Sequence, residues 1–376
     1  MQGQRTIGIV GGGQLGRMLT LAAKPLGFNV IVINPTAHSP AYQVGADEII
    51  ADLYNPGALR ALALRADFIT IEIEHLDAAV LKELANTGTP INPAPATIAL
   101  IQDKLLQKRA LAGWKIPTAD FDEITDETSA QKLLKRFGGS MIIKTRFGGY
   151  DGRGNAVVKN PVQVHQAIAR LQGQALYAEA VVPFTKELAV MVAKDMKGTV
   201  IAYPVVETIH RRNICIEVLA PAAVSEIVSS GASKLAKKVA TKLDGAGMFG
   251  IEMFLTKDDK VLVNEIAPRV HNSGHYSIEA NRTSQFEQHI RAISGLPLGS
   301  TELLSPAVMI NILGERNGPT EISGIAEALQ VAGVSVHLYG KSPTKIDRKM
   351  GHITATAKTL QAAKKNARNA RKKIRI

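Results

Sequence analysis

The sequence predicts an α/β protein that continues into α+β domains, and three observations support this prediction. Short apolar runs alternate with helical patterns over the first hundred residues, a proline-rich segment interrupts the pattern, and strand-like runs dominate the middle of the chain. With 376 residues, 45% of them hydrophobic, the chain can form two or three domains with sizeable cores. No apolar run approaches the roughly 18 residues that span a bilayer, so we expect a cytoplasmic protein without a membrane partner.

The first domain, residues 1–100, is expected to be Rossmann-like. Alternating strands and helices are typical of βαβ units on a parallel sheet. The expected strands are TIGIVG, FNVIVINP, ADEIIAD and DFITIEI, and the expected helices lie in GQLGRMLTLAAKPLG, PGALRALALRA and AAVLKELANTG. The segment PINPAPAT, which has three prolines in eight residues, is interpreted as a linker.

Two further domains follow the linker. The patterns predict, in order, a helix at about 98–111, strands over 140–206, a long helix at 224–243, a hairpin, a helix at 285–293, and a mixed region from about 303 with strands AVMINIL and VSVHLYG. We therefore place a central domain at 101–295, with a small lid subdomain at about 115–180, and a small mixed C-terminal domain with a basic tail at 296–376.

The positive charge is concentrated at one end of the chain. The net charge is +12, and residues 341–376 contain twelve Lys and Arg against one acid, Asp347. The last part, KKNARNARKKIRI, is compatible with a polyanion partner, but no aromatic residue interleaves with it for base stacking. We interpret it as a solvated tail or helix face and expect no nucleic-acid partner. Cys215 is the only cysteine, which excludes an internal disulfide and predicts a small buried or half-buried side chain.

A basic glycine-rich loop lies within IIKTRFGGYDGRGN, residues 142–155. Its glycines, Gly148, Gly149, Gly152 and Gly154, let backbone N–H groups turn inward. Lys144 adds a charge at the base of the loop, and Arg146 and Arg153 can meet phosphate or carboxylate oxygens. The pattern predicts a loop that wraps a polyphosphate. The alternative is a flexible hairpin tip with solvated arginines.

A second glycine motif stands between the first strand and the first helix. Gly11, Gly13 and Gly16 fit the dinucleotide-binding spacing, but a nicotinamide site needs an acidic residue at the end of the second strand, where Asn34 and Pro35 stand. We therefore interpret the motif as a tight turn whose helix N-terminus holds another anion, such as a substrate phosphate.

Two glutamates are expected to oppose each other on a hairpin. Asp258 and Asp259 centre a turn between two apolar strands, and a hairpin symmetric about that turn places Glu252 opposite Glu265. Like charges in that arrangement are destabilising, unless a divalent cation lies between them and nucleotide phosphates. The pair thus predicts a Mg²⁺ site, with Mn²⁺ as an alternative ion. The other reading pairs one glutamate with an arginine such as Arg269.

A polar loop follows this hairpin. His271 and His275 have i, i+4 spacing, but Gly274 disfavours the helix that a zinc site would need. We expect the loop, with Asn272, to hold an anionic substrate.

Together these segments resemble the ATP-grasp ligases. The resemblance rests on Lys104 in QDKLLQK, Lys144, GGYDGRG, YAEAVVPFTKE and the two glutamates. With GGGQLGRM, TIEIEH, NEIAPRVHNSGH and RKMGHIT, the chain is similar to the N5-carboxyaminoimidazole ribonucleotide synthase family over about residues 5–357, and the tail is unmatched. The resemblance implies a central ATP-grasp fold and a homodimer. It also implies a carbon–nitrogen ligase that uses ATP and bicarbonate to carboxylate 5-aminoimidazole ribonucleotide, through carboxyphosphate, in purine biosynthesis.

The resemblance also implies a role for each site residue. Metal binding falls to Glu252 and Glu265. The nucleotide site would comprise Lys104, Lys144, Gly149, Tyr150, Asp151, Gly152, Arg153, Gly154, Asn155, Glu179, Ala180, Val181, Val182, Glu187, His210, Asn264 and Glu265. The catalytic group around bicarbonate and the ribonucleotide would comprise Tyr150, Asp151, Arg153, Arg269, His271 and Lys349. The acceptor would be bound by Gly13, Gln14, Leu15, Glu74, Asn272, Lys341 and Arg348.

Two positions depart from the family pattern. Ala267 stands where many ATP-grasp enzymes have a metal-binding Asn, and His75 follows Glu74 where the family often has Asn. Three rival functions are open from the sequence: a formate-dependent glycinamide ribonucleotide transformylase, an NAD-dependent oxidoreductase, and a polyanion-binding protein.

Overall fold

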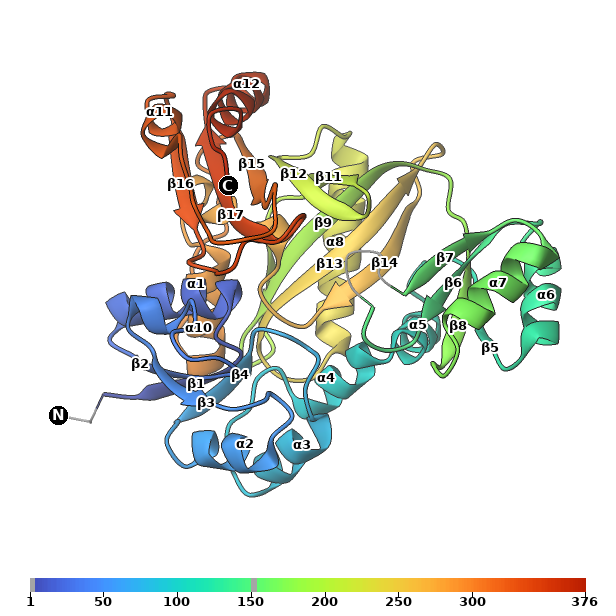
Figure 1. Ribbon diagram of the computed structural model, residues 1–376, viewed down its shortest axis with the longest axis horizontal. Coiled ribbons are helices and arrows are strands. Elements are labelled where there is room, and N and C mark those ends of the chain that lie inside the picture. Colours follow the sequence, from blue (N-terminus) through green and yellow to red (C-terminus); the bar gives the residue numbers. More distant parts are fainter. Residues whose placement is uncertain (1–3, 150–153) are drawn as a thin grey trace.

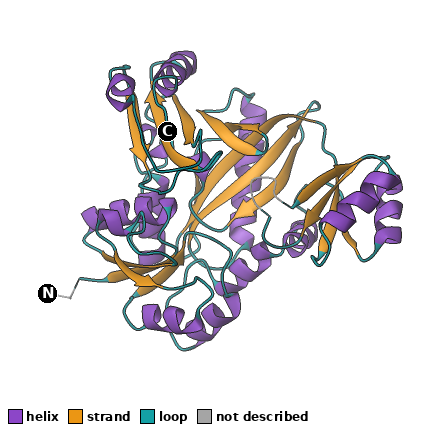
Figure 2. Cartoon of the chain, viewed as in Figure 1, coloured by secondary structure: helices purple, strands orange, loops and turns teal. Residues whose placement is uncertain are grey.

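The computed structural model describes residues 4–149 and 154–376, and their strands form three sheets. Figure 1 shows the N-terminal sheet in blue at one side, a long twisted sheet in the middle and a small sheet in green at the far side. Helices flank each sheet, as Figure 2 shows in purple. Among the described residues, no helix is both long and apolar enough to cross a membrane.

The N-terminal sheet is parallel, with the order β3-β2-β1-β4. Its strands are β1 (Thr6–Val10), β2 (Asn29–Asn34), β3 (Asp47–Ile50) and β4 (Phe68–Ile71). The helices are α1 (Gln14–Ala23), α2 (Pro56–Ala63) and α3 (Ala78–Asn86), with short 3-10 turns η1 (Lys24–Leu26) and η2 (Tyr42–Val44). The two central strands, β1 and β2, are mostly buried, as expected for a parallel sheet covered on both faces. The expected Rossmann-like arrangement is confirmed.

The single helix expected at 98–111 is wrong, because the chain forms two helices there. These are α4 (Pro95–Gln102), which begins inside the expected linker, and α5 (Lys104–Gly113). Asp103 leaves the helical conformation and caps α5, since its Oδ1 accepts the N–H groups of Leu105 and Leu106 at 3.0 and 3.2 Å. The break makes Lys104 the first residue of α5.

The small sheet unit, residues 121–180, is antiparallel with the order β5-β8-β6-β7. It comprises β5 (Phe121–Ile124), α6 (Glu127–Arg136), β6 (Met141–Thr145), β7 (Asn155–Val158), α7 (Pro161–Arg170) and β8 (Leu176–Ala180). Helix α7 lies within residues 140–206, where strands were expected to dominate. It packs against α6 through buried Val164 and Ala167, so the two helices cover the sheet together.

The long sheet has nine strands, in the order β14-β13-β9-β11-β12-β15-β17-β16, with β10 on β9. They are β9 (Phe184–Lys194), β10 (Val200–Ala202), β11 (Val206–Arg211), β12 (Ile214–Ala220), β13 (Gly247–Thr256), β14 (Val261–Ala267), β15 (Ala307–Leu313), β16 (Val334–Leu338) and β17 (Lys349–Thr356). The helices are α8 (Glu226–Lys242), η3 (Asn272–Gly274), α9 (Ser277–Ala280), α10 (Gln285–Ser294), α11 (Ile325–Leu329) and α12 (Leu360–Arg371). Because β12 pairs with β15, the C-terminal strands extend the central sheet.

Helix α10 joins the central sheet to the N-terminal sheet. It packs against α1 and β13. Its buried His289 accepts the N–H of Met248 with Nδ1 at 3.0 Å, so Nε2 carries the proton and donates to Thr70 Oγ1 at 2.7 Å. One side chain therefore ties β4 to β13.

The basic tail forms helix α12, which packs on the sheet. Ala363, Ala367 and Ala370 are buried against the C-terminal strands, while Arg368 pairs with Glu217 at 2.8 Å. The helix-face interpretation of this segment is confirmed. Cys215 is buried, as expected.

Candidate active site

The hairpin of β13 and β14 places Glu252 directly opposite Glu265, as the sequence predicted. The register shifts by one residue beside this pair, since Met253 faces Val263, and Asn264 is the extra residue on β14. Such bulges re-aim side chains next to active sites. Burial, and then the charge of Glu265, raises the pKa of Glu252 to about 7. The two carboxylates are thus an unfavourable pair without a cation.

Lys104 provides one positive charge beside these carboxylates. Its Nζ lies 3.0 Å from Glu265 Oε1. Burial lowers the pKa of Lys104, but Glu265, Glu74 and Glu252 outweigh burial and raise it. The alternative pairing of a hairpin glutamate with Arg269 is wrong in this structure, because Arg269 contacts Glu74 instead.

A buried carboxylate in the small sheet unit contacts two lysines. Glu179, in β8, is 2.9 Å from Lys144 Nζ and 3.3 Å from Lys108 Nζ, and it accepts the hydroxyl of Tyr177 at 3.0 Å. Burial raises the pKa of Glu179, yet the two lysines lower it to about 2. The residues that follow, Ala180, Val181 and Val182, lead from β8 into β9, with Val181 exposed.

The glycine-rich loop connects β6 to β7. Lys144 and Asn155 are opposite each other at its base. Gly154 has a φ of +82°, and a Cβ there would meet Thr145 Oγ1 at 2.5 Å, so this position requires glycine. Gly149 is half-buried. The expected site residues Tyr150, Asp151, Gly152 and Arg153 lie outside the described residues.

Arg146 is engaged by carboxylates rather than solvated. Its Nε is 3.1 Å from Asp103 Oδ1, and its NH1 is 2.7 Å from Glu123 Oε1. The arginine therefore fastens the small sheet unit to the start of α5, and it contradicts the alternative of a hairpin tip with solvated arginines at this position.

The side chains of Glu187 on β9 and His210 on β11 are in contact. His210 Nδ1 is 2.8 Å from Glu187 Oε2. Burial lowers the pKa of His210, but the hydrogen bond and charge of Glu187 outweigh burial and raise it. Both residues also affect the charge of Glu252, so they border the carboxylate pair.

Arg269, just after β14, and Glu74, just after β4, form a bidentate pair. Nε donates to Glu74 Oε2 at 2.6 Å, and NH2 donates to Oε1 at 3.1 Å. Burial opposes ionisation, but Arg269 lowers the pKa of Glu74 to about 2. Burial, and then Arg269 and Lys349, lowers the pKa of neighbouring His271 to about 3, while its Nε2 is 3.5 Å from Glu252 Oε1. These residues connect the metal-binding candidates to the acceptor candidates.

The expected acceptor residues come from both ends of the chain. Lys341 Nζ donates to Gln14 Oε1 at 2.5 Å and to the carbonyl of Lys349 at 3.0 Å. Arg348 NH1 donates to Pro343 O at 2.7 Å. Asn272 exchanges hydrogen bonds with Asn311, at 3.0 and 2.7 Å.

The sequence reasoning missed Lys108 and Glu72. Lys108 follows Lys104 by four residues, so the two lie on one face of α5, and this spacing could have identified it. Glu72 accepts the N–H groups of Gly13 and Gly16, both at 2.5 Å. The expected phosphate position at the N-terminus of α1 is therefore filled by a side chain of the protein, and the same contact opposes a dinucleotide there.

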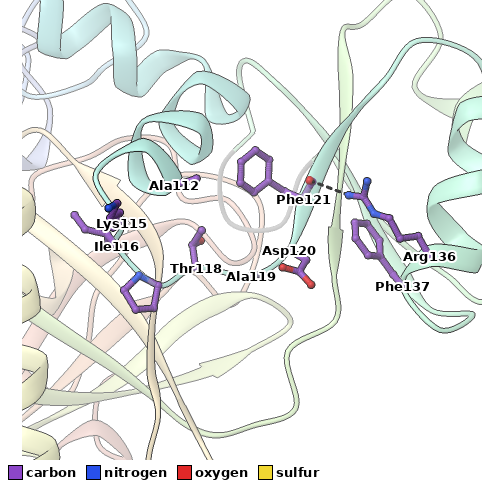
Figure 3. A pocket seen from close by; sticks show the side chains of 10 residues that line it. Ala112, Lys115, Ile116, Thr118, Ala119, Asp120, Phe121, Arg136 and Phe137 are labelled. Carbon is purple, nitrogen blue, oxygen red and sulfur yellow. Dashed lines mark hydrogen bonds between the residues drawn. The ribbon is translucent and has the colours of Figure 1, made fainter.

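A pocket of about 680 Å³ lies where α5 leads into the small sheet unit, and none of the expected site residues lines it. Figure 3 shows the rings of Phe121 and Phe137 beside it, with Arg136 donating to the carbonyl of Phe121 at 3.1 Å. Thr118 lines it and accepts a hydrogen bond from Lys108 at 2.8 Å. The pocket thus backs onto the buried Lys108–Glu179 pair.

Three domain families match consecutive parts of the chain. A ribonucleotide synthetase preATP-grasp domain matches residues 4–102, an ATP-grasp domain matches 109–286, and a phosphoribosylaminoimidazole carboxylase C-terminal domain matches 307–372. The third match includes α12, so the expectation that the tail lies outside the family is wrong.

Known proteins are similar over nearly the whole chain. The N5-carboxyaminoimidazole ribonucleotide synthase of Synechococcus elongatus is 40% identical over 353 residues, which are 93% of this chain and 88% of that protein. The structure of the Thermotoga maritima synthetase is 45% identical, covers 99% of both chains and has a TM-score of 0.90. An Aspergillus clavatus synthase, solved with ADP and 5-aminoimidazole ribonucleotide, is 38% identical over 98% of both chains, with a TM-score of 0.91.

The chain spans about two thirds of the length of the fungal phosphoribosylaminoimidazole carboxylases it matches, 67% for Ogataea methanolica and 65% for Candida albicans.

The fold and the site define an ATP-grasp enzyme. Within that class, the chain belongs to the N5-carboxyaminoimidazole ribonucleotide synthase family. The expected ATP-dependent ligase of purine biosynthesis is confirmed at this level.

Proposed function

We propose that the protein carboxylates 5-aminoimidazole ribonucleotide with bicarbonate, with ATP as the phosphoryl donor. ATP would transfer its γ-phosphoryl group to bicarbonate and release ADP. The exocyclic amine of the ribonucleotide would then bond to the carboxyl carbon of carboxyphosphate, directly or through released CO₂, as phosphate leaves. The products are N5-carboxyaminoimidazole ribonucleotide, ADP and phosphate.

One observation supports this proposal above the others. Glu252 faces Glu265 in a partly buried site, with Lys104 3.0 Å from Glu265. Opposed carboxylates with an adjacent lysine form a site for a triphosphate that brings a divalent cation with it.

The donor set fits Mg²⁺. Among residues 4–149 and 154–376, no three His, Cys, Asp or Glu side chains gather as a complete metal site. Mg²⁺ binds proteins through one or two carboxylates plus substrate phosphates and water, so Glu252 and Glu265 suffice, with Asn264 beside them. The ion would neutralise charge on the transferred phosphoryl group.

The protein's own groups would hold the nucleotide and the transferred charge. Lys104 and Lys144 would bind phosphate oxygens, together with the N–H groups of the loop from Gly149 to Asn155. Glu179 to Val182 would border the adenine, Glu187 would accept the ribose hydroxyls, and His210 would lie beside the nucleotide. The loop would close over carboxyphosphate and exclude water.

The acceptor and bicarbonate would lie between the N-terminal and C-terminal residues of the site. Glu74 orients Arg269 by accepting a hydrogen bond from its Nε. NH1 of Arg269 donates to the carbonyl of Val270 at 3.1 Å, so part of the guanidinium group is hydrogen-bonded within the protein. Arg269 and His271 would orient bicarbonate, together with Tyr150, Asp151 and Arg153. Lys341, Arg348 and Lys349 would bind the 5′-phosphate, and Glu74 and Asn272 would contact the remaining acceptor groups.

The finer statements belong to the same proposal. These are domain limits at 1–100, 101–295 and 296–376, a lid at about 115–180, a homodimer and a cytoplasmic location. The matches to family domains at 4–102, 109–286 and 307–372 support similar limits.

ADP release is the experiment that tests the reaction. The protein is incubated with Mg²⁺, ATP and bicarbonate, with and without 5-aminoimidazole ribonucleotide. We expect strong stimulation by the ribonucleotide, loss in Glu265→Gln, and normal activity in Glu302→Gln, whose side chain is 62% exposed. Stimulation by glycinamide ribonucleotide and formate instead would favour the rival transformylase, and no stimulation by either would refute the assigned acceptor.

A further inference from the structure

A carboxylate of the chain occupies the N-terminus of helix α1. Glu72 Oε1 accepts the N–H of Gly13, and Oε2 accepts the N–H of Gly16, both at 2.5 Å. Glu72 directly follows β4, and the turn into α1 directly follows β1, the parallel neighbour of β4. Unpaired N–H groups and the helix dipole attract an anion to this position. The fold therefore brings Glu72 to the place where other glycine turns bind phosphate.

The glycines of the turn leave room for this carboxylate. A Cβ at Gly11 would lie 2.2 Å from Cγ of Glu72, and a Cβ at Gly13 would lie 2.6 Å from its Oε1. Real Cβ atoms do not approach other atoms so closely. The glycine spacing that suggested a nucleotide site is thus explained by Glu72 itself.

The turn held by Glu72 positions a contact with the C-terminal residues. Gln14 lies between Gly13 and Gly16, and its Oε1 accepts a hydrogen bond from Lys341 at 2.5 Å. Gln43 Nε2 donates to the carbonyl of Gly340, the residue before Lys341, at 2.9 Å. The loop that carries Lys341 therefore docks on the N-terminal turn, and its position depends on where Gln14 is held.

We propose that Glu72 is a positioning residue for the acceptor nucleotide, which fixes Gln14 against Lys341 and directs the acceptor phosphate to the cations of the C-terminal residues. The inference rests on the proposed ribonucleotide carboxylation. Glu72 touches no reacting atom; it acts through the turn. Because it occupies two donors at the helix N-terminus, the phosphate is left to Lys341, Arg348 and Lys349 rather than to α1.

The test compares Glu72→Gln with the wild type by steady-state kinetics and by calorimetric binding of 5-aminoimidazole ribonucleotide. Glutamine keeps the length but turns an N–H₂ group toward a backbone N–H. We expect the KM and Kd for the ribonucleotide to rise about tenfold or more, and the KM for ATP to stay within about twofold. Glu72→Asp, which keeps the charge but is shorter, should recover part of the affinity.

Asp77→Asn is the matched control, because Asp77 caps helix α3 of the same domain with bonds to the N–H groups of Ala79 and Val80 at 3.0 and 3.1 Å. It should leave both KM values unchanged. A Glu72→Gln protein that loses thermal stability but keeps the ribonucleotide KM and Kd overturns the inference, since Glu72 would then only cap the helix.

A second variant tests the inference in case the Glu72→Gln protein does not fold. Gln14→Ala removes the contact with Lys341 and should weaken ribonucleotide binding by about tenfold, without changing the KM for ATP; unchanged binding overturns the inference. A wild type that binds the ribonucleotide without faster ADP release refutes the proposed reaction alone, and calorimetry of the variants still decides the role of Glu72. A wild type that binds no ribonucleotide overturns both.

Discussion

Glu252 and Glu265 face each other across neighbouring strands, and their repulsion should make the protein less stable when no cation is bound. Burial and Glu265 raise the pKa of Glu252 to about 7, from 4.5. The contribution of Glu252 to stability is therefore present at low pH, and it is lost as the pH rises from 4.5 to 7. We expect Glu252→Gln to be about 2 kcal/mol more stable than wild type at about pH 8, with little difference at about pH 5. Urea unfolding without divalent cations at both pH values measures this, and an equal difference at both would contradict it.

Bound Mg²⁺ and nucleotide should make the wild type more stable than the Glu252→Gln variant. With Mg²⁺ and ADP at about a hundred times Kd, the wild type should gain about 2.7 kcal/mol, because the ligands bind only the folded state. Glu265→Gln and Glu252→Gln should gain far less. Thermal unfolding with Mg²⁺ plus ADP, and with ADP plus a chelator, separates the metal's effect. Equal stabilisation of wild type and both variants would argue against a metal between the carboxylates.

The glutamate pair could be predicted from sequence because both residues belong to one hairpin. The turn at Asp258 and Asp259 sets the approximate register, and alternation sets the face. The one-residue bulge at Asn264 could not be predicted, since a bulge has no fixed sequence signature. The break at Asp103 was missed for a related reason: an Asp within an apolar helical pattern is also compatible with a continuous helix.

Contacts between segments that are distant in the chain could not be predicted from the sequence. Glu74 and Arg269 were both identified as site residues, but they are separated by 195 positions, and their pairing depends on how two sheets pack. Glu72 was overlooked because its role depends on the parallel pairing of β4 with β1. The residue types in a site were thus visible, while the partner of each residue was not.

Lys108 should be essential for stability because it neutralises a buried carboxylate. Lys108 and Glu179 are each 3% exposed and 3.3 Å apart. Lys108→Met would leave Glu179 in a buried position with one lysine fewer, and we expect a loss of about 3 kcal/mol in urea unfolding. Lys132→Met, on the exposed face of α6, is the control and should change little. A loss below about 0.5 kcal/mol for Lys108→Met would mean that Lys144 alone satisfies Glu179.

His289 should make the protein sensitive to mild acid. Burial lowers its pKa to about 3, from 6.5, so its contribution to stability is present above pH 6.5 and is lost as the pH falls toward 3. Between about pH 7.5 and pH 5, this residue alone should account for about 2 kcal/mol of lost stability. In His289→Gln the loss over that range should shrink by the same amount, whereas His165→Gln, 69% exposed on α7, should match wild type. Parallel pH profiles for wild type and His289→Gln would contradict the assignment.

Arg269 should be required for chemistry and dispensable for nucleotide binding. Its planar fork holds both oxygens of Glu74, and a lysine offers only one point of contact. Arg269→Lys should therefore misplace the bicarbonate and acceptor groups and reduce ribonucleotide-stimulated ADP release about a hundredfold. Binding of ADP with Mg²⁺, measured by calorimetry, should be retained because Lys104, Lys144 and the hairpin carboxylates are unchanged. Arg282→Lys, 63% exposed and 4.0 Å from Glu302, serves as the control. Loss of ADP binding in Arg269→Lys would place this arginine in the nucleotide site, and near-normal turnover would remove it from the catalytic group.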